Sequence, residues 1–240
     1  RDPVVLDNTL AIIVSQSAAA ADTLAALREL KEKGAKVVSV VNVVDSSIAR
    51  ESDGVVYIQA GPEIGVASTK AYTLQILTIT LIAAHFADVR GGTSEHELIE
   101  LRRAMLGLPE QAQKLIERED DVKSVAAKYF EAPDALYLGR GVNLPSAMEG
   151  ALKLKEISYI HAEGYSAGEM KHGPIALVEP SLFTVAIAVK GDVYDKMIGN
   201  IQEIKARSGP VIGVAFDGDT EIPRQADDVL WLPACPELLT

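Results

Sequence analysis

Ionisable side chains are concentrated within residues 149–172, and four of them are of types that could move protons together: Glu149, Lys153, Glu156 and His172. Glu149, Lys153 and Glu156 are separated by four and then by three residues. On a helix these steps place all three side chains on one face, about one turn apart. His172 follows a little further along the chain. Two carboxylates, an ammonium group and an imidazole near a helix–loop junction are suited to move protons on and off a small substrate.

A helix followed by a loop is predicted to position these groups. Residues 147–157 contain good helix formers and no proline, which favours a helix. Gly164 and Gly168 then break the pattern, so we expect Glu169 and His172 to lie on a loop. Glu–Lys pairs at helical spacing are also typical of solvated helix faces, where they form weak ion pairs. Spacing alone therefore leaves a catalytic and a surface interpretation open.

The bulk composition is that of an ordinary globular protein. The chain has 240 residues, 48% of them hydrophobic and 24% charged, which allows one large domain or two small ones. The net charge of −11 argues against nucleic acid and anionic membranes as partners. An anionic small substrate stays possible, because helix N-termini and local side chains bind anions whatever the net charge.

Cofactor, metal and membrane sites are not expected. The only cysteine, Cys235, rules out an internal disulfide and a two-cysteine metal site, and it fits a reducing cytoplasm. A Gly-x-Gly at residues 139–141 lacks the rest of the dinucleotide fingerprint, so no such cofactor is predicted. The apolar run 74–84 is too short to cross a bilayer, and we interpret it as part of a buried helix.

Alternating strands and helices predict an α/β fold with two lobes. Each lobe is expected to be a doubly wound, flavodoxin-like parallel sheet flanked by helices, with ligands at the carboxyl ends of its strands. The predicted lobes are 1–92 and 132–240, joined by a polar helical segment, 93–131, that is interrupted near Gly107 and Pro109. No clear sequence repeat relates them. The predicted strands are 9–14, 36–44, 55–59, 135–139, 182–189, 211–216 and 227–232.

A candidate anion site follows the first predicted strand. Ser15, Gln16 and Ser17 stand between that strand and a helix that runs to Lys33. Backbone N–H groups at a helix N-terminus and serine hydroxyls both donate hydrogen bonds to phosphate oxygens. Either serine can equally be a simple helix cap. From the residues alone, the anion-site and helix-cap interpretations are equally well supported.

Longer stretches of sequence resemble one family. The text EGALKLKEISYIHAE, followed by GEMKHGP, resembles the sugar-isomerase (SIS) half of glucosamine-6-phosphate synthases, which aminate fructose 6-phosphate. The resemblance implies that Glu156 is the base in proton transfer, that Lys153 assists at the sugar oxygens and that Glu149 supports it. It also implies that His172 helps to open the sugar ring from a neighbouring subunit, and hence that the protein is a homodimer.

The first lobe resembles the same family with one departure. Ser15, Gln16 and Ser17 match the family's phosphate loop, but Ala18–Ala20 replace its Gly-Glu-Thr, which removes a hydroxyl that helps to hold the phosphate. The resemblance also implies that Val66 and Ser68 line the sugar.

The resemblance covers essentially the whole chain and raises alternative functions. The family's glutaminase half and its C-terminal lysine tail find no match in this chain, which puts full synthase activity in doubt. A non-catalytic, regulatory sugar-phosphate-binding SIS protein is the main alternative. An isomerase or deglycase for another amino-sugar phosphate is a third.

The altered phosphate loop is open to a direct test. We expect Ala20→Thr to tighten the binding of fructose 6-phosphate, because a restored neutral hydrogen bond is worth about 0.5–1.5 kcal/mol, or roughly 2- to 12-fold in Kd. Calorimetric titration measures this affinity, with unphosphorylated fructose as the control ligand. Equal affinity in the two proteins would show that position 20 does not contact the phosphate.

Overall fold

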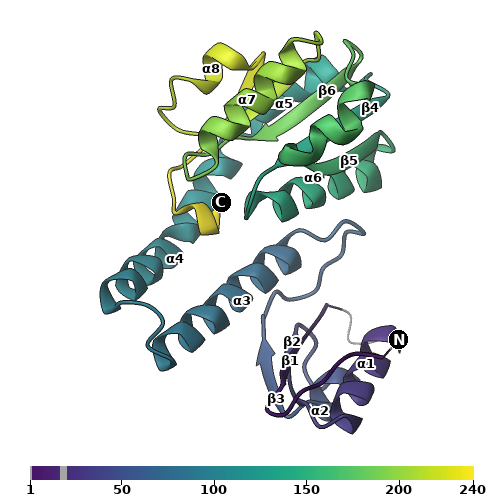
Figure 1. Ribbon diagram of the computed structural model, residues 1–240, viewed down its shortest axis with the longest axis vertical. Coiled ribbons are helices and arrows are strands. Elements are labelled where there is room, and N and C mark those ends of the chain that lie inside the picture. Colours follow the sequence, from purple (N-terminus) through teal and green to yellow (C-terminus); the bar gives the residue numbers. More distant parts are fainter. Residues whose placement is uncertain (1, 17–20) are drawn as a thin grey trace. The chain divides into compact units, whose positions relative to one another are not determined.

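The computed structural model describes residues 2–16 and 21–240 and divides the chain into two compact units. These units are residues 1–98 and 99–240 (Figure 1). The helical segment predicted at 93–131 contains α4 (Glu95–Ile116), which spans the division, and α5 (Glu119–Tyr129). Helix α4 runs without a break through Pro109, so the interruption predicted there is wrong.

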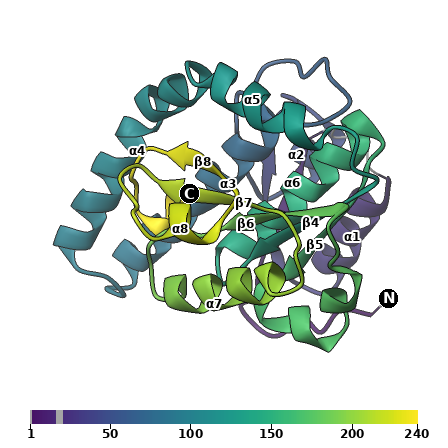
Figure 2. The same ribbon diagram turned by 90° about the horizontal axis from the view of Figure 1, so that it is seen from above.

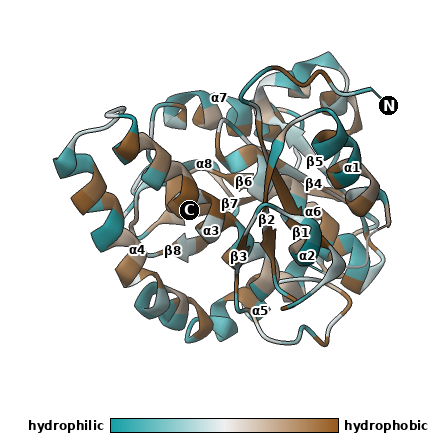
Figure 3. Ribbon diagram, turned by 90° about the horizontal axis from the view of Figure 1, so that it is seen from below, coloured by the Kyte–Doolittle hydropathy of each residue, from teal (hydrophilic) through white to brown (hydrophobic). Residues whose placement is uncertain are grey.

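The first unit is built on a three-stranded parallel sheet in the order β1-β2-β3. Apolar runs rich in Val and Ile form the strands, as they do in buried parallel sheets, and Figure 3 shows β1 and β2 as strongly hydrophobic. Leu27 of α1 packs on this sheet with Val37 and Ile48, and all three are fully buried. The elements are β1 (Leu10–Ser15), α1 (Ala21–Glu32), β2 (Lys36–Val41), α2 (Ser47–Glu51), β3 (Gly54–Tyr57) and α3 (Lys70–Val89).

The second unit contains a five-stranded parallel sheet in the order β5-β4-β6-β7-β8. Its elements after α5 are β4 (Asp134–Gly139), α6 (Asn143–Ser158), β5 (His161–Ser166), the 3-10 turns η1 (Ala167–His172) and η2 (Pro174–Leu177), β6 (Leu182–Ile187), α7 (Tyr194–Lys205), β7 (Val211–Phe216), α8 (Ile222–Gln225), β8 (Asp228–Leu232) and the 3-10 turn η3 (Glu237–Leu239).

Helices cover both faces of this second sheet (Figure 2). Leu138, Ile201 and Ile222 form a buried cluster that joins the sheet to α7 and α8. Ala151 of α6 and Phe183 of β6 belong to a second cluster, against which Tyr129 of α5 packs. The predicted class, doubly wound parallel α/β, is therefore confirmed.

Two local predictions differ from the structure. Strand β5 was not predicted, because its sequence HAEGYS is polar and contains a glycine. The helix expected to be buried is α3, in which Ala71 and Thr80 are the buried residues, so that interpretation is wrong. By length and composition alone, α3 is the one helix among the described residues that is long and apolar enough to cross a membrane, a test that core helices of soluble proteins also pass.

The structure reveals a repeat that the sequence does not make obvious. Between β2 and β3, Val38 pairs with Gly54; between β7 and β8, Ile212 pairs with Asp228. The two residues of each pair are 16 positions apart in the sequence. Each residue of the second pair stands 174 positions after its counterpart in the first pair. The unit β1–α1–β2–α2–β3 therefore corresponds to β6–α7–β7–α8–β8.

The repeat explains the apolar surface of β1. Register matches Leu10 and Ile12 with Phe183 and Val185 of β6. Phe183 and Val185 are 6% and 9% exposed, because the unit β4–α6–β5 covers them, whereas Leu10 and Ile12 are 44% and 39% exposed. In the described part of the first unit, β1 is thus an edge strand with an open apolar face.

An ion pair of the first lobe recurs in the second lobe 174 positions later in the sequence. The Asp53 carboxylate accepts a hydrogen bond from the Val37 amide at 2.8 Å, and Lys31 Nζ lies 3.2 Å from it. In the second lobe the Asp227 carboxylate accepts from the Val211 amide at 2.7 Å and from Lys205 Nζ at 2.6 Å. Each aspartate thereby ties a helix end to the start of a central strand.

These contacts lower the pKa of both aspartates. The Val37 amide and then Lys31 stabilise the Asp53 carboxylate and lower its pKa. Burial alone would raise the pKa of Asp227, but hydrogen bonds from Lys205 and the Val211 amide outweigh burial and lower it. A lowered pKa in the folded state means that each carboxylate stabilises the fold above its unfolded pKa of about 3.9 and that this contribution is lost as the pH falls through the folded-state pKa.

We expect Asp227→Asn to lower the urea midpoint of unfolding at pH 7, because the variant loses the charge that pairs with Lys205. The difference from the wild type should begin to shrink below about pH 4, the unfolded-state pKa, and should be lost once the pH has fallen through the lowered pKa of the native carboxylate. Fluorescence of Trp231, the single tryptophan, reports on β8 in this lobe.

The matched variant in the first lobe is Asp53→Asn, followed through hydrogen exchange of the Val37 amide. Glu110→Gln serves as the control, because Glu110 only forms an exposed pair with Lys114 on α4. A difference between Asp227→Asn and the wild type that persists undiminished at pH 2 would contradict the electrostatic explanation.

Candidate functional site

The structure brings Glu149, Lys153 and Glu156 together on one face of α6. Lys153 Nζ lies 2.7 Å from Glu156 Oε2 and 3.2 Å from Glu149 Oε1. The three side chains are 20–31% exposed, so they are partly withdrawn from solvent but open to a ligand. One ammonium group therefore bridges two carboxylates on consecutive turns of a helix.

The charge state of Lys153 follows from this arrangement. Burial alone would lower the pKa of Lys153, but its hydrogen bonds to Glu156 and Glu149 outweigh burial and raise it. Lys153 therefore stays protonated at neutral pH and acts as a donor and a positive charge. With two carboxylates sharing one ammonium group, one carboxylate is available to accept a proton while the lysine stabilises negative charge on a nearby oxygen.

Small residues hold α6 close to the sheet. Ala147 and Ala151, on the face that meets the strands, are 0% and 1% exposed. At the start of the helix a side chain on Gly139 would place its Cβ 2.2 Å from the Asn143 carbonyl oxygen, closer than any real contact. The backbone at the end of β4 thus touches the first turn of α6, which fixes where the Glu–Lys–Glu cluster lies.

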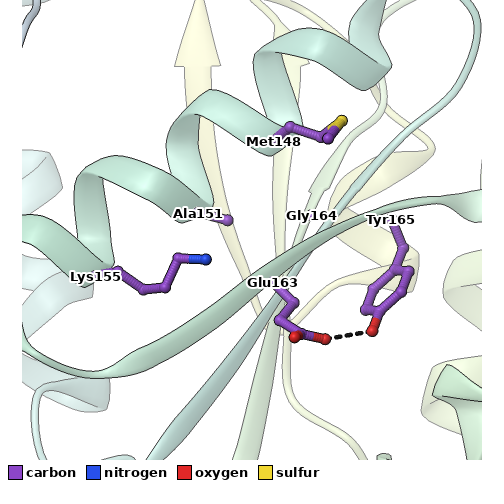
Figure 4. A pocket seen from close by; sticks show the side chains of 6 residues that line it. All are labelled: Met148, Ala151, Lys155, Glu163, Gly164 and Tyr165. Atoms are coloured by element: carbon purple, nitrogen blue, oxygen red, sulfur yellow. Dashed lines mark hydrogen bonds between the residues drawn. The ribbon is translucent and has the colours of Figure 1, made fainter. Parts of the chain in front are cut away.

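A pocket of about 250 Å³ opens between α6 and β5. It is lined by Met148, Ala151, Lys155, Glu163, Gly164 and Tyr165 (Figure 4). Glu163 accepts a hydrogen bond from the Tyr165 hydroxyl, which raises the pKa of that phenol. Met148, Ala151 and Lys155 occupy a helix face about a third of a turn away from Glu149, Lys153 and Glu156, so the pocket and the cluster are on different sides of α6.

His172 lies on the 3-10 turn η1 rather than on a loop without regular structure. Its side chain is exposed, and it makes no hydrogen bond or ion pair with another described residue. Glu169 is also exposed on this turn. The structure does not join His172 to Glu149, Lys153 or Glu156 by a direct contact within the described chain.

The predicted phosphate residues lie at the carboxyl end of β1. Ser15 ends the strand and is 8% exposed. The side-chain oxygen of Gln16 is buried and has no hydrogen-bond partner among the described residues. Ser17 lies outside the described residues, as do Ala18–Ala20. The role of this turn in phosphate binding therefore stays a prediction.

The predicted sugar-lining residues lie on the segment that follows β3. Val66 is 95% exposed, and the Ser68 hydroxyl donates to Glu63 at 2.9 Å. Glu63 also accepts from the Thr69 amide at 2.7 Å, a bond that lowers its pKa and satisfies the start of α3. Sequence reasoning missed Glu63, although a carboxylate six residues before a helix start is a recognisable signal.

Asn42 is a second residue that sequence reasoning missed. It follows β2, donates to the Gly61 carbonyl at 2.8 Å and accepts from the Ala60 amide at 2.9 Å. Asn42 thereby anchors the segment that carries Glu63, Val66 and Ser68 at the carboxyl edge of the sheet. No group of three or more metal-ligating side chains occurs among the residues that the structure describes.

The family model of the SIS domain matches residues 2–85 and 128–239, which cover most of both lobes. A glutamine–fructose-6-phosphate aminotransferase (isomerizing) from Thermus thermophilus is 52% identical over 239 residues, covering 100% of this chain and 40% of the relative. The enzyme of the same name from Clostridium tetani is 46% identical over 233 residues, covering 97% of this chain and 38% of the relative. The chain thus spans about 40% of the length of these relatives.

Among solved structures, the C-terminal domain of glucosamine-fructose-6-phosphate aminotransferase from Francisella tularensis is similar to this chain. The TM-score is 0.93 at 34% sequence identity, and the match covers 99% of this chain and 67% of that one.

The close approach at Gly139 predicts a sensitive position. We expect Gly139→Ala to lower the free energy of unfolding by about 1–3 kcal/mol, because the new methyl group must displace the backbone of α6. Gly199→Ala is the control, since Gly199 lies inside α7 with nothing within 4 Å of the added methyl group. That variant should gain about 0.5–1 kcal/mol. Urea unfolding monitored by Trp231 fluorescence compares them, and equal stability of the two variants would refute the steric argument.

Proposed function

Because this chain belongs to the SIS domain family, we propose that it carries the sugar-isomerase chemistry of the aminotransferases it resembles. The proposed reaction converts fructose 6-phosphate and ammonia into glucosamine 6-phosphate. The chemistry has three needs: the phosphate must be held, the sugar ring opened, and a proton moved between adjacent carbons. The whole reaction draws on ammonia from a glutaminase part that this chain does not match.

The Glu–Lys–Glu cluster on α6 is the observation that carries this proposal. Glu156 takes a proton from one carbon of the open-chain sugar and returns it to the neighbouring carbon. Lys153, held charged by both carboxylates, stabilises the negative charge that develops on the sugar oxygen. Glu149 supports Lys153 from the preceding turn.

The remaining roles follow the family resemblance. His172 assists ring opening, for which an imidazole is suited because its two ring nitrogens can donate and accept a proton. Ser15, Gln16 and Ser17 bind the phosphate, while Val66 and Ser68 line the sugar. We further propose that the protein acts as a homodimer in the cytoplasm, with His172 of each subunit serving the other subunit's site.

Binding is the first test of this function. Calorimetric titration with fructose 6-phosphate and glucose 6-phosphate is compared with titration by sulfate and by the unphosphorylated sugars. Binding of the phosphosugars, but not of the sugars, supports a sugar-phosphate site. Failure of both phosphosugars to bind would refute the proposal for this chain.

We expect Glu156→Gln to abolish exchange of the carbon-bound proton while phosphosugar affinity changes less than about twofold. The amide keeps the size of the side chain but is a far weaker base. Proton exchange in heavy water, followed by NMR, measures the first quantity and calorimetry the second. Glu131→Gln, which removes an exposed carboxylate after α5, is the control and should retain exchange. Retained exchange in Glu156→Gln would remove Glu156 from this role.

A further inference from the structure

The 3-10 turn η1 has three distinct faces. Side chains three residues apart line up on a 3-10 helix. Ala167 and Met170 are both fully buried in the core of the second lobe. Glu169 and His172 are both exposed. The third pair, Gly168 and Lys171, is also exposed, but both residues contact neighbouring side chains of the second lobe.

Arg140 lies directly against Gly168. A Cβ built on Gly168 would lie 3.2 Å from Arg140 Nη2 and 3.5 Å from both Cζ and Nη1. Gly168 does not have the left-handed backbone conformation that favours glycine, and an added Cβ there would be closer to the guanidinium than most real contacts are. Arg140 follows β4 in the turn that leads into α6.

A buried asparagine connects this arginine to the other end of the turn. Asn200 of α7 is 7% exposed, and its side-chain oxygen accepts a hydrogen bond from Arg140 Nη1 at 2.7 Å. Its amide group donates to Glu203 at 3.3 Å, and Glu203 pairs with Lys171 at 2.8 Å. The chain Arg140–Asn200–Glu203–Lys171 thus contacts η1 on both sides of Glu169.

We propose that Arg140, held by Asn200, is a positioning residue that fixes the direction in which η1 presents Glu169 and His172. Fixing one face of a 3-10 turn fixes the other two, because the three faces share one backbone. The role in turnover rests on the proposed function of His172. The role in ordering the turn does not, and the two are tested separately.

Hydrogen exchange tests the ordering role without any substrate. Arg140→Met keeps the length of the side chain but removes the guanidinium, and we expect amide exchange of residues 167–172 to rise about tenfold or more, with exchange of α6 unchanged. The imidazole resonance of His172 should also shift. Arg118→Met is the matched control, because the Arg118 guanidinium also donates to a residue far along the chain, at 2.8 Å to Asp217 just after β7, but does not contact η1. Unchanged exchange and an unchanged His172 resonance in Arg140→Met would overturn the proposal.

Paired variants of Asn200 test whether the arginine acts through it. Asn200→Asp keeps an acceptor for Arg140 and should preserve slow exchange of η1. Asn200→Leu removes the acceptor and should reproduce the effect of Arg140→Met. Both variants also lose the donor to Glu203, so Glu203→Gln is measured beside them. If Glu203→Gln keeps slow exchange of η1 while the aspartate and leucine variants behave alike, the hydrogen bond from Arg140 does not order the turn.

Kinetics test the role in turnover. Misplacing a catalytic group lowers the rate by as much as about 10²-fold. We therefore expect kcat of Arg140→Met to fall by about 10- to 100-fold, while its KM for fructose 6-phosphate stays within about twofold of the wild-type value. A faster-exchanging turn with unchanged kcat would overturn the catalytic part of the inference. If the wild type binds no phosphosugar, the proposed function fails, and the exchange experiment alone decides whether Arg140 orders η1.

Discussion

Parallel strand pairing is the constraint on which the rest of each lobe depends. Parallel strands require crossovers, and these bring the carboxyl ends of all strands to one edge of the sheet. In the second lobe the register pairs Gly139, the last residue of β4, with Ser166, the last residue of β5. The start of α6 and the start of η1 are therefore set side by side by backbone hydrogen bonds. The contact between Arg140 and Gly168 is a direct consequence of that register.

Side-chain size then decides how α6 lies on the sheet. Ala147 and Ala151 face the strands, so the helix approaches closely, and Gly139 allows its first turn to touch the end of β4. The larger polar residues of α6 are left on the sides of the helix. One side carries the Glu–Lys–Glu cluster and another contributes to the pocket beside β5 (Figure 4). The two sites are separated by helical geometry.

The sequence predicted features that depend on local pattern and failed where tertiary context decides. The apolar run of β7 was placed at 211–216, as observed, and the helical spacing of Glu149, Lys153 and Glu156 predicted their shared face. Strand β5 could not be recognised, because an edge strand needs few apolar residues. The apolar composition of α3 indicated burial, yet composition does not say which other elements are present to cover a helix.

The repeat was hidden for a related reason. Most of its matched positions keep only apolar character, as between Val38 and Ile212, and such matches are common by chance. The informative identities are the two ion-paired residues of each lobe, Lys31 with Asp53 and Lys205 with Asp227, which are separated by 22 residues in both cases. Strand register shows that these identities are equivalent, and register is not visible in a sequence.

Stability alone does not account for the cluster on α6. Partly exposed ion pairs contribute about 0–1 kcal/mol, and a second carboxylate beside the same ammonium group adds repulsion to any further attraction. About 70–80% of each of the three side chains, Glu149, Lys153 and Glu156, is also withdrawn from solvent, which costs hydration free energy. A helix that needed only to cover the sheet would do so with its alanine face and leave this face to solvated residues. The proposed reaction, in which a charged lysine and a free carboxylate act on the same substrate, gives the cluster a role that stability does not.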